Sequence, residues 1–243
     1  MAGVHVRRVK AIIFDVDRTL IVSQSGFNKS LRVATNSLVH YLRKHGVSIS
    51  KNDVYKSLRP IASYFEKRGS YARDEWWDKL LRDIDLSRLS GPWIHRVTLL
   101  YWRTFIAMSP PYHDAEKTVR TLRARGYTLA LVSDTDGTPG IKRKRIRSLP
   151  FYDVFKTAIV AGEDTPRIKP DKASFVMVAK RLGLSPRVCI YVGDNPRVDV
   201  EGARNVGMQT IIVKRRRKLR GARPELTIDR LGKLLTIFKG PAE

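Results

Sequence analysis

The chain has 243 residues, which is enough for one substantial core or for a core domain that carries an inserted lobe. Its 47 Lys and Arg residues outnumber 23 Asp and Glu, and the formal net charge of +24 and pI near 10.5 point to polyanionic partners rather than cationic ones. The single cysteine, Cys189, excludes an intramolecular disulfide, and no segment has a signal-peptide core or the roughly twenty apolar residues that span a bilayer, so we expect a soluble cytoplasmic protein.

The first predicted element is a strand, and a long helical insertion follows it. Residues 9–14 are mostly apolar or β-branched and end abruptly at Asp15, as a buried parallel strand does. From about 23 to 108 the pattern changes to helical segments rich in Leu, Tyr and Trp with charged faces. We interpret this stretch as an inserted helical lobe whose core, rather than a substrate platform, contains Trp76, Trp77, Trp93 and Trp102.

After the lobe, strands and helices alternate. Helices are predicted over 114–125 and over 170–182, the second packing through Phe175, Val176, Val178 and Ala179, and a terminal helix is predicted over 226–238. Apolar runs of strand length occur at 128–132, 157–160, 188–192 and 210–213. This alternation favours an α/β fold with an open, mostly parallel sheet covered on both faces, in which ligands bind beyond the carboxyl ends of the strands.

Two clusters hold much of the positive charge. Residues 142–147 include five basic side chains in six, and residues 214–223 include seven in ten. Either the clusters are a solvated surface, or they contact the phosphate backbone of RNA or the ribosome, and no familiar nucleic-acid motif decides between the two. The candidate contacts are Lys142, Arg143, Lys144, Arg145, Lys214, Arg215, Arg216, Arg217, Lys218 and Arg220.

Polar side chains lie at several strand ends, where a ligand is expected. Asp15 and Asp17 come directly after the first strand, Ser133 follows the run at 128–132, and Asp194 follows the run at 188–192. Lys169 stands just before a predicted helix. Each residue alone is typical of a turn or a helix cap. Their joint occurrence in this order indicates a site, in which a hydroxyl and an ammonium suit phosphoryl oxygens.

Together these residues resemble the four motifs of the haloacid dehalogenase (HAD) superfamily: a DxDx[TV] loop, a strand-ending Ser or Thr, a Lys and a GD-type acidic loop. The resemblance covers residues 9–22 and 109–213. It implies a Rossmann-like, three-layer parallel sheet core over residues 1–22 and 109–243. It also implies a helical cap domain, inserted straight after the first motif, over residues 23–108.

The resemblance further implies a magnesium-dependent phosphatase that hydrolyses a small phosphate ester through an aspartyl-phosphate. Asp15 would be the nucleophile, and Asp17 the acid for the leaving oxygen and then the base for water. Mg²⁺ would be held by Asp15, Asp194 and the backbone carbonyl of Asp17, with Asn195 and Asp199 supporting these ligands. The phosphoryl oxygens would be contacted by Thr19, Ser133, Asp134 and Lys169.

The sequence also bears on which reaction of this superfamily the protein catalyses. Asp17 favours phosphatase over dehalogenase chemistry, because a halide leaves without a proton and an alkoxide does not. Phosphotransfer to a second substrate stays open, as does an RNA- or ribosome-associated protein of this fold, with or without phosphatase activity. Two positions depart from the motifs: Arg18 replaces the usual glycine, and Asp134 replaces the usual Asn or Gly. The oligomeric state is not indicated.

Overall fold

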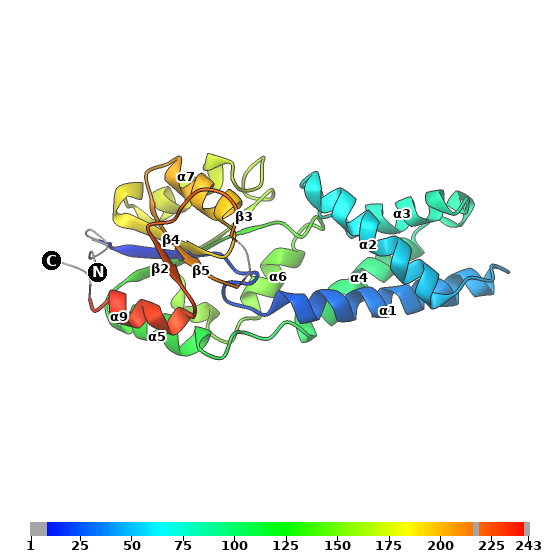
Figure 1. Ribbon diagram of the computed structural model, residues 1–243, viewed down its shortest axis with the longest axis horizontal. Helices are drawn as coiled ribbons and strands as arrows, with labels where there is room; N and C mark the ends of the chain where they lie inside the picture. Colours follow the sequence, from blue (N-terminus) through cyan, green and yellow to red (C-terminus); the bar gives the residue numbers. More distant parts are fainter. Residues whose placement is uncertain (1–8, 216–218, 241–243) are drawn as a thin grey trace. The chain divides into compact units, whose positions relative to one another are not determined.

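The computed structural model describes residues 9–215 and 219–240 (Figure 1). The chain divides into two compact units. The first, the sheet unit, comprises Met1–Val22, Pro111–Thr135 and Lys142–Glu243. The second, the helical unit, comprises Ser23–Pro110 and Asp136–Ile141. The expected cap at 23–108 falls within the helical unit, to which the segment after the second strand also belongs.

The sheet unit contains a six-stranded sheet in the part of the chain that is described, with the order β3-β2-β1-β4-β5-β6. Each strand is parallel to its neighbours, which confirms the predicted parallel α/β fold. Five strands match the apolar runs found in the sequence. The strands are β1 (Ala11–Phe14), β2 (Thr128–Asp134), β3 (Thr157–Ala161), β4 (Cys189–Gly193), β5 (Gln209–Val213) and β6 (Leu226–Ile228).

Alternate residues of the central strand β1 pack on opposite faces of the sheet. Ile12 and Phe14 belong to one apolar cluster, to which α5 and α9 contribute, and Ile13 belongs to a second cluster, to which α7 contributes. Figure 1 shows α7 on one side of the sheet and α5 and α9 on the other, so the three layers are confirmed. The helices are α5 (Ala115–Ala124), α6 (Ile141–Arg147), α7 (Lys172–Leu182), α8 (Glu201–Arg204) and α9 (Leu234–Ile237).

Two predictions about helices in this unit are wrong. The terminal helix predicted over 226–238 begins instead with a strand, because Leu226–Ile228 adds to the edge of the sheet beside β5, and α9 covers only Leu234–Ile237. Val176 is 45% exposed and does not belong to the packing stripe of α7. Short edge strands carry too few residues for their period to stand out from a neighbouring helix.

The helical unit has its own core. Trp76, Trp77 and Trp102 are buried in it, and Trp93 packs against it half-buried, as predicted for the lobe tryptophans. The guanidinium of Arg73 lies 3.7 Å from the centre of the Trp76 ring and is itself buried. The helices of this unit are α1 (Ser23–Lys44), α2 (Lys51–Lys67), α3 (Arg73–Asp83) and α4 (Trp93–Ala107).

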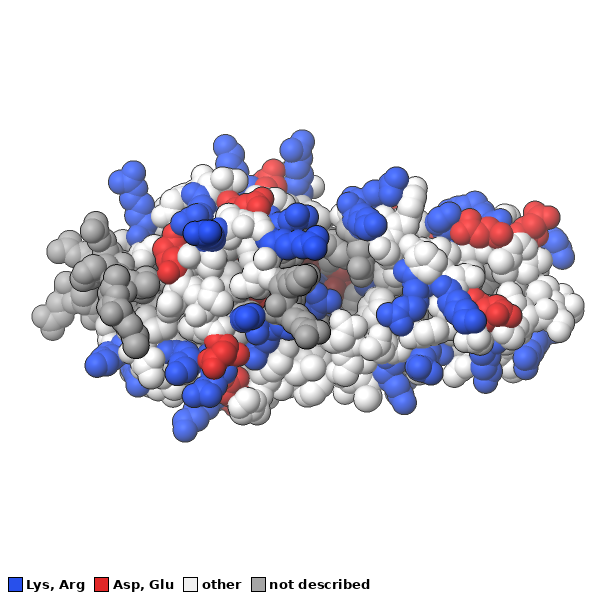
Figure 2. Space-filling model, viewed as in Figure 1, with Lys and Arg blue, Asp and Glu red and all other residues white. Residues whose placement is uncertain are grey.

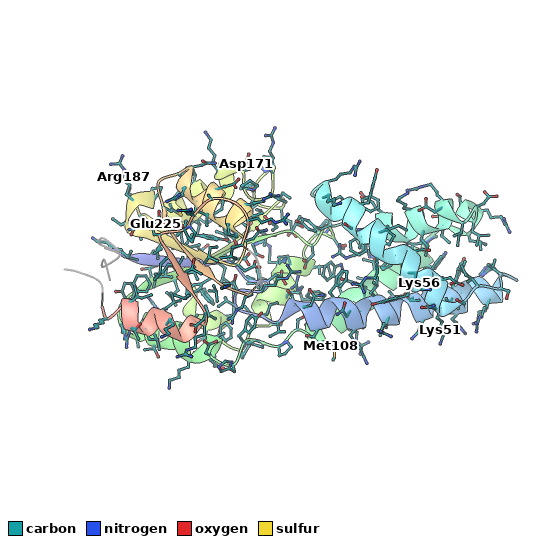
Figure 3. The ribbon with its side chains drawn as sticks, in the orientation of Figure 1. Lys51, Lys56, Met108, Asp171, Arg187 and Glu225 are labelled. Atoms are coloured by element: carbon teal, nitrogen blue, oxygen red, sulfur yellow. The ribbon has the colours of Figure 1, made fainter. Side chains whose placement is uncertain are left out.

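The positive charge is spread over the surface. Figure 2 shows Lys and Arg side chains on both units, with fewer acidic ones between them, on the face in view. Lys51, Lys56 and Arg187, labelled in Figure 3, are exposed. The thiol of Cys189 is buried, and burial raises its pKa to about 11. Within the described ranges, no helix combines the length and the apolar character needed to cross a membrane.

Candidate active site

The loop after β1 brings the first acidic pair to the carboxyl edge of the sheet. Hydrogen bonds fold it tightly: the Arg18 amide donates to the Ile21 carbonyl at 3.0 Å, and the Thr19 hydroxyl donates to Asp15 Oδ2 at 3.2 Å. Arg18 has a φ of 61°, in the left-handed region where glycine is favoured. The backbone of the loop thus explains why glycine is usual at this position of the motif, and Arg18 adopts the same conformation.

Lys169 is the centre of a buried hydrogen-bond network at this edge. Its side chain is 3% exposed, and its ammonium donates to Asp15 Oδ1 at 2.8 Å, to Asp199 Oδ1 at 2.9 Å and to the Tyr191 hydroxyl at 3.0 Å. The Lys169 amide donates to Asp134 Oδ1 at 2.8 Å. An ammonium has three donors, and here all three have acceptors, so Lys169 is fixed beside Asp15.

Asp199 fixes the acidic loop that follows β4. Its Oδ2 accepts the amides of Asp194 at 3.0 Å and of Asn195 at 2.9 Å, while its Oδ1 accepts from Lys169. A Cβ at Gly193 would lie 2.2 Å from Asp199 Oδ2, so glycine is required for this close approach. The Asp199 carboxylate is therefore engaged in positioning Lys169 and the Asp194 backbone.

Ser133 and Asp134 end β2, the neighbour of β1. Phe14 pairs with Leu131, so the buried Ser133 lies two residues further along, beside the start of the acidic loop. Asp134 Oδ1 accepts the hydrogen bond from the Lys169 amide, so Asp134 is a positioning group for Lys169. Its contact with a phosphate stays a prediction.

Two residues of the first basic cluster do not lie on the surface. Lys142 and Arg145, side chains 4% exposed, donate to the two carboxylate oxygens of Asp17, each at 2.5 Å. Burial alone would raise the pKa of Asp17, but Arg145 and Lys142 outweigh it and hold that pKa well below its usual range. The prediction that both contact nucleic acid is wrong, because each is buried against a carboxylate.

The other basic candidates fall into four groups. Arg143 is half-buried and donates to Asp164 Oδ1 at 2.9 Å, so it is paired within the fold. Lys144, Lys214 and Arg220 are exposed. Arg215 is partly buried against an aromatic ring. The remaining three candidates, Arg216, Arg217 and Lys218, lie outside the described residues.

Tyr191 is a site residue that was not predicted from the sequence. Its hydroxyl donates to the Val132 carbonyl at 2.8 Å and accepts from Lys169, so it links β4 to β2 beneath the site. Burial holds the pKa of Tyr191 well above its usual range. The apolar run 188–192 predicts a buried strand. A tyrosine in such a strand needs a hydrogen-bond partner for its hydroxyl, and this requirement could have identified Tyr191 from the sequence.

Carboxylates crowd around Asp15. Burial raises the pKa of Asp15 to about 7; Lys169 opposes the rise, and Asp199 and Asp194 add to it. Burial alone would lower the pKa of Lys169, but Asp15 and Asp199 outweigh it and hold that pKa well above its usual value. Repulsion among these acids is what a divalent cation bound at this edge would relieve.

Residues 9–207 match the family model of the haloacid dehalogenase-like hydrolases. The chain belongs to this family. This HAD hydrolase is 28% identical over 208 residues to a glyceraldehyde 3-phosphate phosphatase of Pyrococcus furiosus, which covers 86% of this chain and 82% of the relative. It is 35% identical over 134 residues to a phosphoserine phosphatase of Thermus thermophilus, covering 55% of this chain and 52% of the relative. A HAD phosphatase from Thermococcus onnurineus has a TM-score of 0.71 at 26% identity and covers 96% of this chain and 99% of its own.

These similarities confirm the predicted superfamily, the fold and the enzyme class, a hydrolase of phosphoric monoesters. None of them supports RNA or the ribosome as a partner of this HAD hydrolase. The comparisons do not assign roles to individual residues.

Proposed function

We propose that this HAD hydrolase is a magnesium-dependent phosphomonoesterase that works through a phosphorylated Asp15. The observation that carries the proposal is the 2.8 Å hydrogen bond from the Lys169 ammonium to Asp15 Oδ1, buried at the carboxyl edge of the sheet. It supports a carboxylate nucleophile that is held next to a cation able to receive phosphoryl oxygens.

The reaction would take two steps. A carboxylate oxygen of Asp15 attacks phosphorus, the bond from phosphorus to the leaving oxygen breaks, and Asp17 provides the proton for that oxygen. Water, giving its proton to Asp17, then attacks the same phosphorus, so that Asp15 is restored and inorganic phosphate is released. Lys169 and Thr19 each have one donor bound to Asp15, and these two donors are released as the carboxylate turns to phosphorus. Together with the Ser133 hydroxyl they then donate to the phosphoryl oxygens.

The residues at the site fit a magnesium ion. Its ligands would be the carboxylates of Asp15 and Asp194 and the backbone carbonyl of Asp17, an all-oxygen set of the kind that Mg²⁺ accepts while it keeps several waters. The described residues contain no group of three or more His, Cys, Asp or Glu side chains arranged for a metal, so carbonyl and water ligands must complete the shell. When bound, the ion offsets the charge of the phosphate dianion and lets a carboxylate approach it.

Purified protein is expected to hydrolyse p-nitrophenyl phosphate in the presence of Mg²⁺. Chelation with EDTA should lower the rate by at least about 100-fold, because a bound metal supplies several kcal/mol of charge stabilisation, and added Mg²⁺ should restore it. Release of nitrophenolate measures both rates, and p-nitrophenyl acetate is the control for unspecific hydrolysis. Activity that EDTA leaves unchanged would reject the metal, and failure to hydrolyse a panel of phosphate esters would reject the function.

Binding of Mg²⁺ should also stabilise the protein, and more strongly at pH about 8 than at pH about 5.5. The pKa of Asp15 is about 7 in the folded metal-free chain and 3.8 in the ordinary case, so the folded state binds more protons between these values. Its stability therefore falls as pH rises through that window, and Mg²⁺ replaces the lost proton at the upper end. Thermal unfolding with and without millimolar Mg²⁺ at the two pH values checks this. An equal rise in Tm at both would contradict it.

The substrate is proposed to be a small phosphate monoester. Because the Pyrococcus furiosus relative is a glyceraldehyde 3-phosphate phosphatase, three-carbon phosphates are the first compounds to test. A screen of such metabolites, read out as released inorganic phosphate, ranks them by kcat/KM.

A further inference from the structure

Arg215 has two buried hydrogen-bond donors without an acceptor. Its guanidinium carbon lies 3.6 Å from the centre of the Tyr112 ring, so the plane of the group stacks on the aromatic face. Its Nε and Nη2 atoms are both buried and have no hydrogen-bond partner in the structure. Leaving a buried donor unsatisfied costs about 1–3 kcal/mol, so a pair of them on one side chain calls for an explanation.

The two unsatisfied donors form one edge of the guanidinium. Nε–H and Nη2–H point the same way in the plane of the group, which is the fork that binds two oxygens of one oxyanion side by side. Stacking on Tyr112 fixes the plane of the guanidinium and so the direction in which that edge points. An arginine that served only as solvated surface would expose these donors to water, whereas here they are shielded from it.

Arg215 lies in the sheet unit, just beyond the carboxyl end of a strand. Strand β5 runs parallel to β4 with Ile212 beside Gly193, so β5 and β4 end at the same edge of the sheet, with Asp194 following β4 and Arg215 following β5. This is the edge of the sheet that carries the acidic loops.

Tyr112 ties the pair to the first acidic loop. Its amide donates to the Leu20 carbonyl at 2.9 Å. Burial raises the pKa of its hydroxyl; Arg215 and Arg18 lower it and Asp194 raises it, as expected of a ring that lies among these charges. Tyr112, on which Arg215 stacks, is thus within electrostatic reach of the proposed metal ligand Asp194.

We propose that Arg215, supported by Tyr112, binds a carboxylate that the substrate carries in addition to its phosphate. The inference rests on the proposed function, because it specifies which phosphate esters the site prefers. A carboxylate matches the guanidinium fork in geometry, with two oxygens in one plane, and in charge, with one unit against one. The phosphate itself is served by Lys169 and the hydroxyls near it, so the Arg215 fork is left for a second group.

Three substrates that differ only at one carbon test the proposal: 3-phosphoglycerate, glyceraldehyde 3-phosphate and glycerol 3-phosphate carry a carboxylate, an aldehyde and an alcohol there. Wild-type protein should show at least about 10-fold higher kcat/KM for the acid, since a hydrogen bond to a charged group is worth that much. Arg215→Met should lower kcat/KM for the acid by about 10- to 100-fold, mainly through KM, and change the other two by less than about 3-fold.

Two further variants separate the fork from its charge. Arg215→Lys keeps the charge but not the two-donor edge, and it should recover only part of the lost preference. Arg187→Met makes the same chemical change at an exposed arginine and should leave all three kcat/KM values at the wild-type level. The Tm of each variant shows whether the fold is intact.

A binding measurement keeps the proposal distinct from the proposed function. Calorimetric titration of Asp15→Asn protein, which needs no turnover, should give tighter binding of 3-phosphoglycerate than of glycerol 3-phosphate, and adding Arg215→Met should remove the difference. Equal binding of both compounds, or an equal loss for all substrates in Arg215→Met, would overturn the proposal. So would an Arg215→Met protein that keeps its substrate preference but loses salt-sensitive RNA binding, because the fork would then serve a nucleic-acid phosphate.

Discussion

Replacing Asp15 with asparagine is expected to lower kcat by at least about 10⁴-fold, the scale seen when a covalent nucleophile is removed. The amide keeps an oxygen for the Lys169 hydrogen bond at the position of Oδ1, so the buried network stays in place. It lacks the negative charge and the nucleophilic oxygen that the first step needs. Turnover of p-nitrophenyl phosphate at saturating Mg²⁺ measures the loss.

The same substitution should not unfold the protein. Removing the Asp15 charge relieves its repulsion with Asp194 and Asp199, so the metal-free variant should unfold at or above the wild-type Tm at pH about 8. Its rise in Tm on adding Mg²⁺ should shrink, because one proposed ligand is gone.

An exposed carboxylate provides the matched control for Asp15. Asp83→Asn makes the same chemical change at a surface position and should leave kcat unchanged. After rapid acid quench of wild-type protein with substrate, peptide mass spectrometry should find a phosphoryl adduct on the peptide that carries Asp15. An Asp15→Asn protein that retains wild-type turnover would rule out this nucleophile.

The parallel sheet could be predicted because buried strands have a recognisable pattern in the sequence. Runs such as 128–132 and 188–192 are apolar on both faces, since helices cover both sides of the sheet, and polar residues appear where each run ends. The edge strand Leu226–Ile228 has three residues and an exposed threonine, so it lacks this apolar pattern. Its partner, β5, was needed to recognise it.

The role of Lys142 and Arg145 could not be predicted from local sequence. Five basic residues in six predict a solvated or RNA-binding segment. The Asp17 carboxylate, which binds Lys142 and Arg145, is 125 and 128 residues away in the sequence. Burial of a charge is decided by a tertiary partner, and a charge pattern does not identify that partner. The motif residues Asp15, Lys169 and Asp194 were easier to predict as site residues. The ends of parallel strands meet at one edge of the sheet, whatever the distance between them in sequence.

Asp17→Asn is expected to affect substrates according to their leaving groups. In the structure the Asp17 carboxylate is bound by Lys142 and Arg145, so it is ionised, and it is a weak base while both cations hold it. To act as an acid it must first gain a proton, and a carboxylate that bridges two cations does so only when substrate binding loosens at least one of them. The leaving oxygen of an alkyl phosphate needs that proton, whereas p-nitrophenolate leaves as a stable anion.

The variant should therefore lower kcat/KM for alkyl phosphates by about 10²- to 10⁴-fold and for p-nitrophenyl phosphate by much less. Because kcat/KM covers only the steps up to transfer of the phosphoryl group, the loss isolates the acid role. The later loss of the base should appear as a lower kcat for both substrates, with a burst of nitrophenolate when the phosphorylated enzyme accumulates. We expect a plot of log kcat/KM against leaving-group pKa to be steeper for Asp17→Asn than for wild type, and to have the wild-type slope for Asp83→Asn. This result would show that Asp17 protonates the leaving oxygen. An equal drop for every leaving group would show instead that Asp17 serves to hold Lys142 and Arg145 in place, with its carboxylate taking no part in proton transfer.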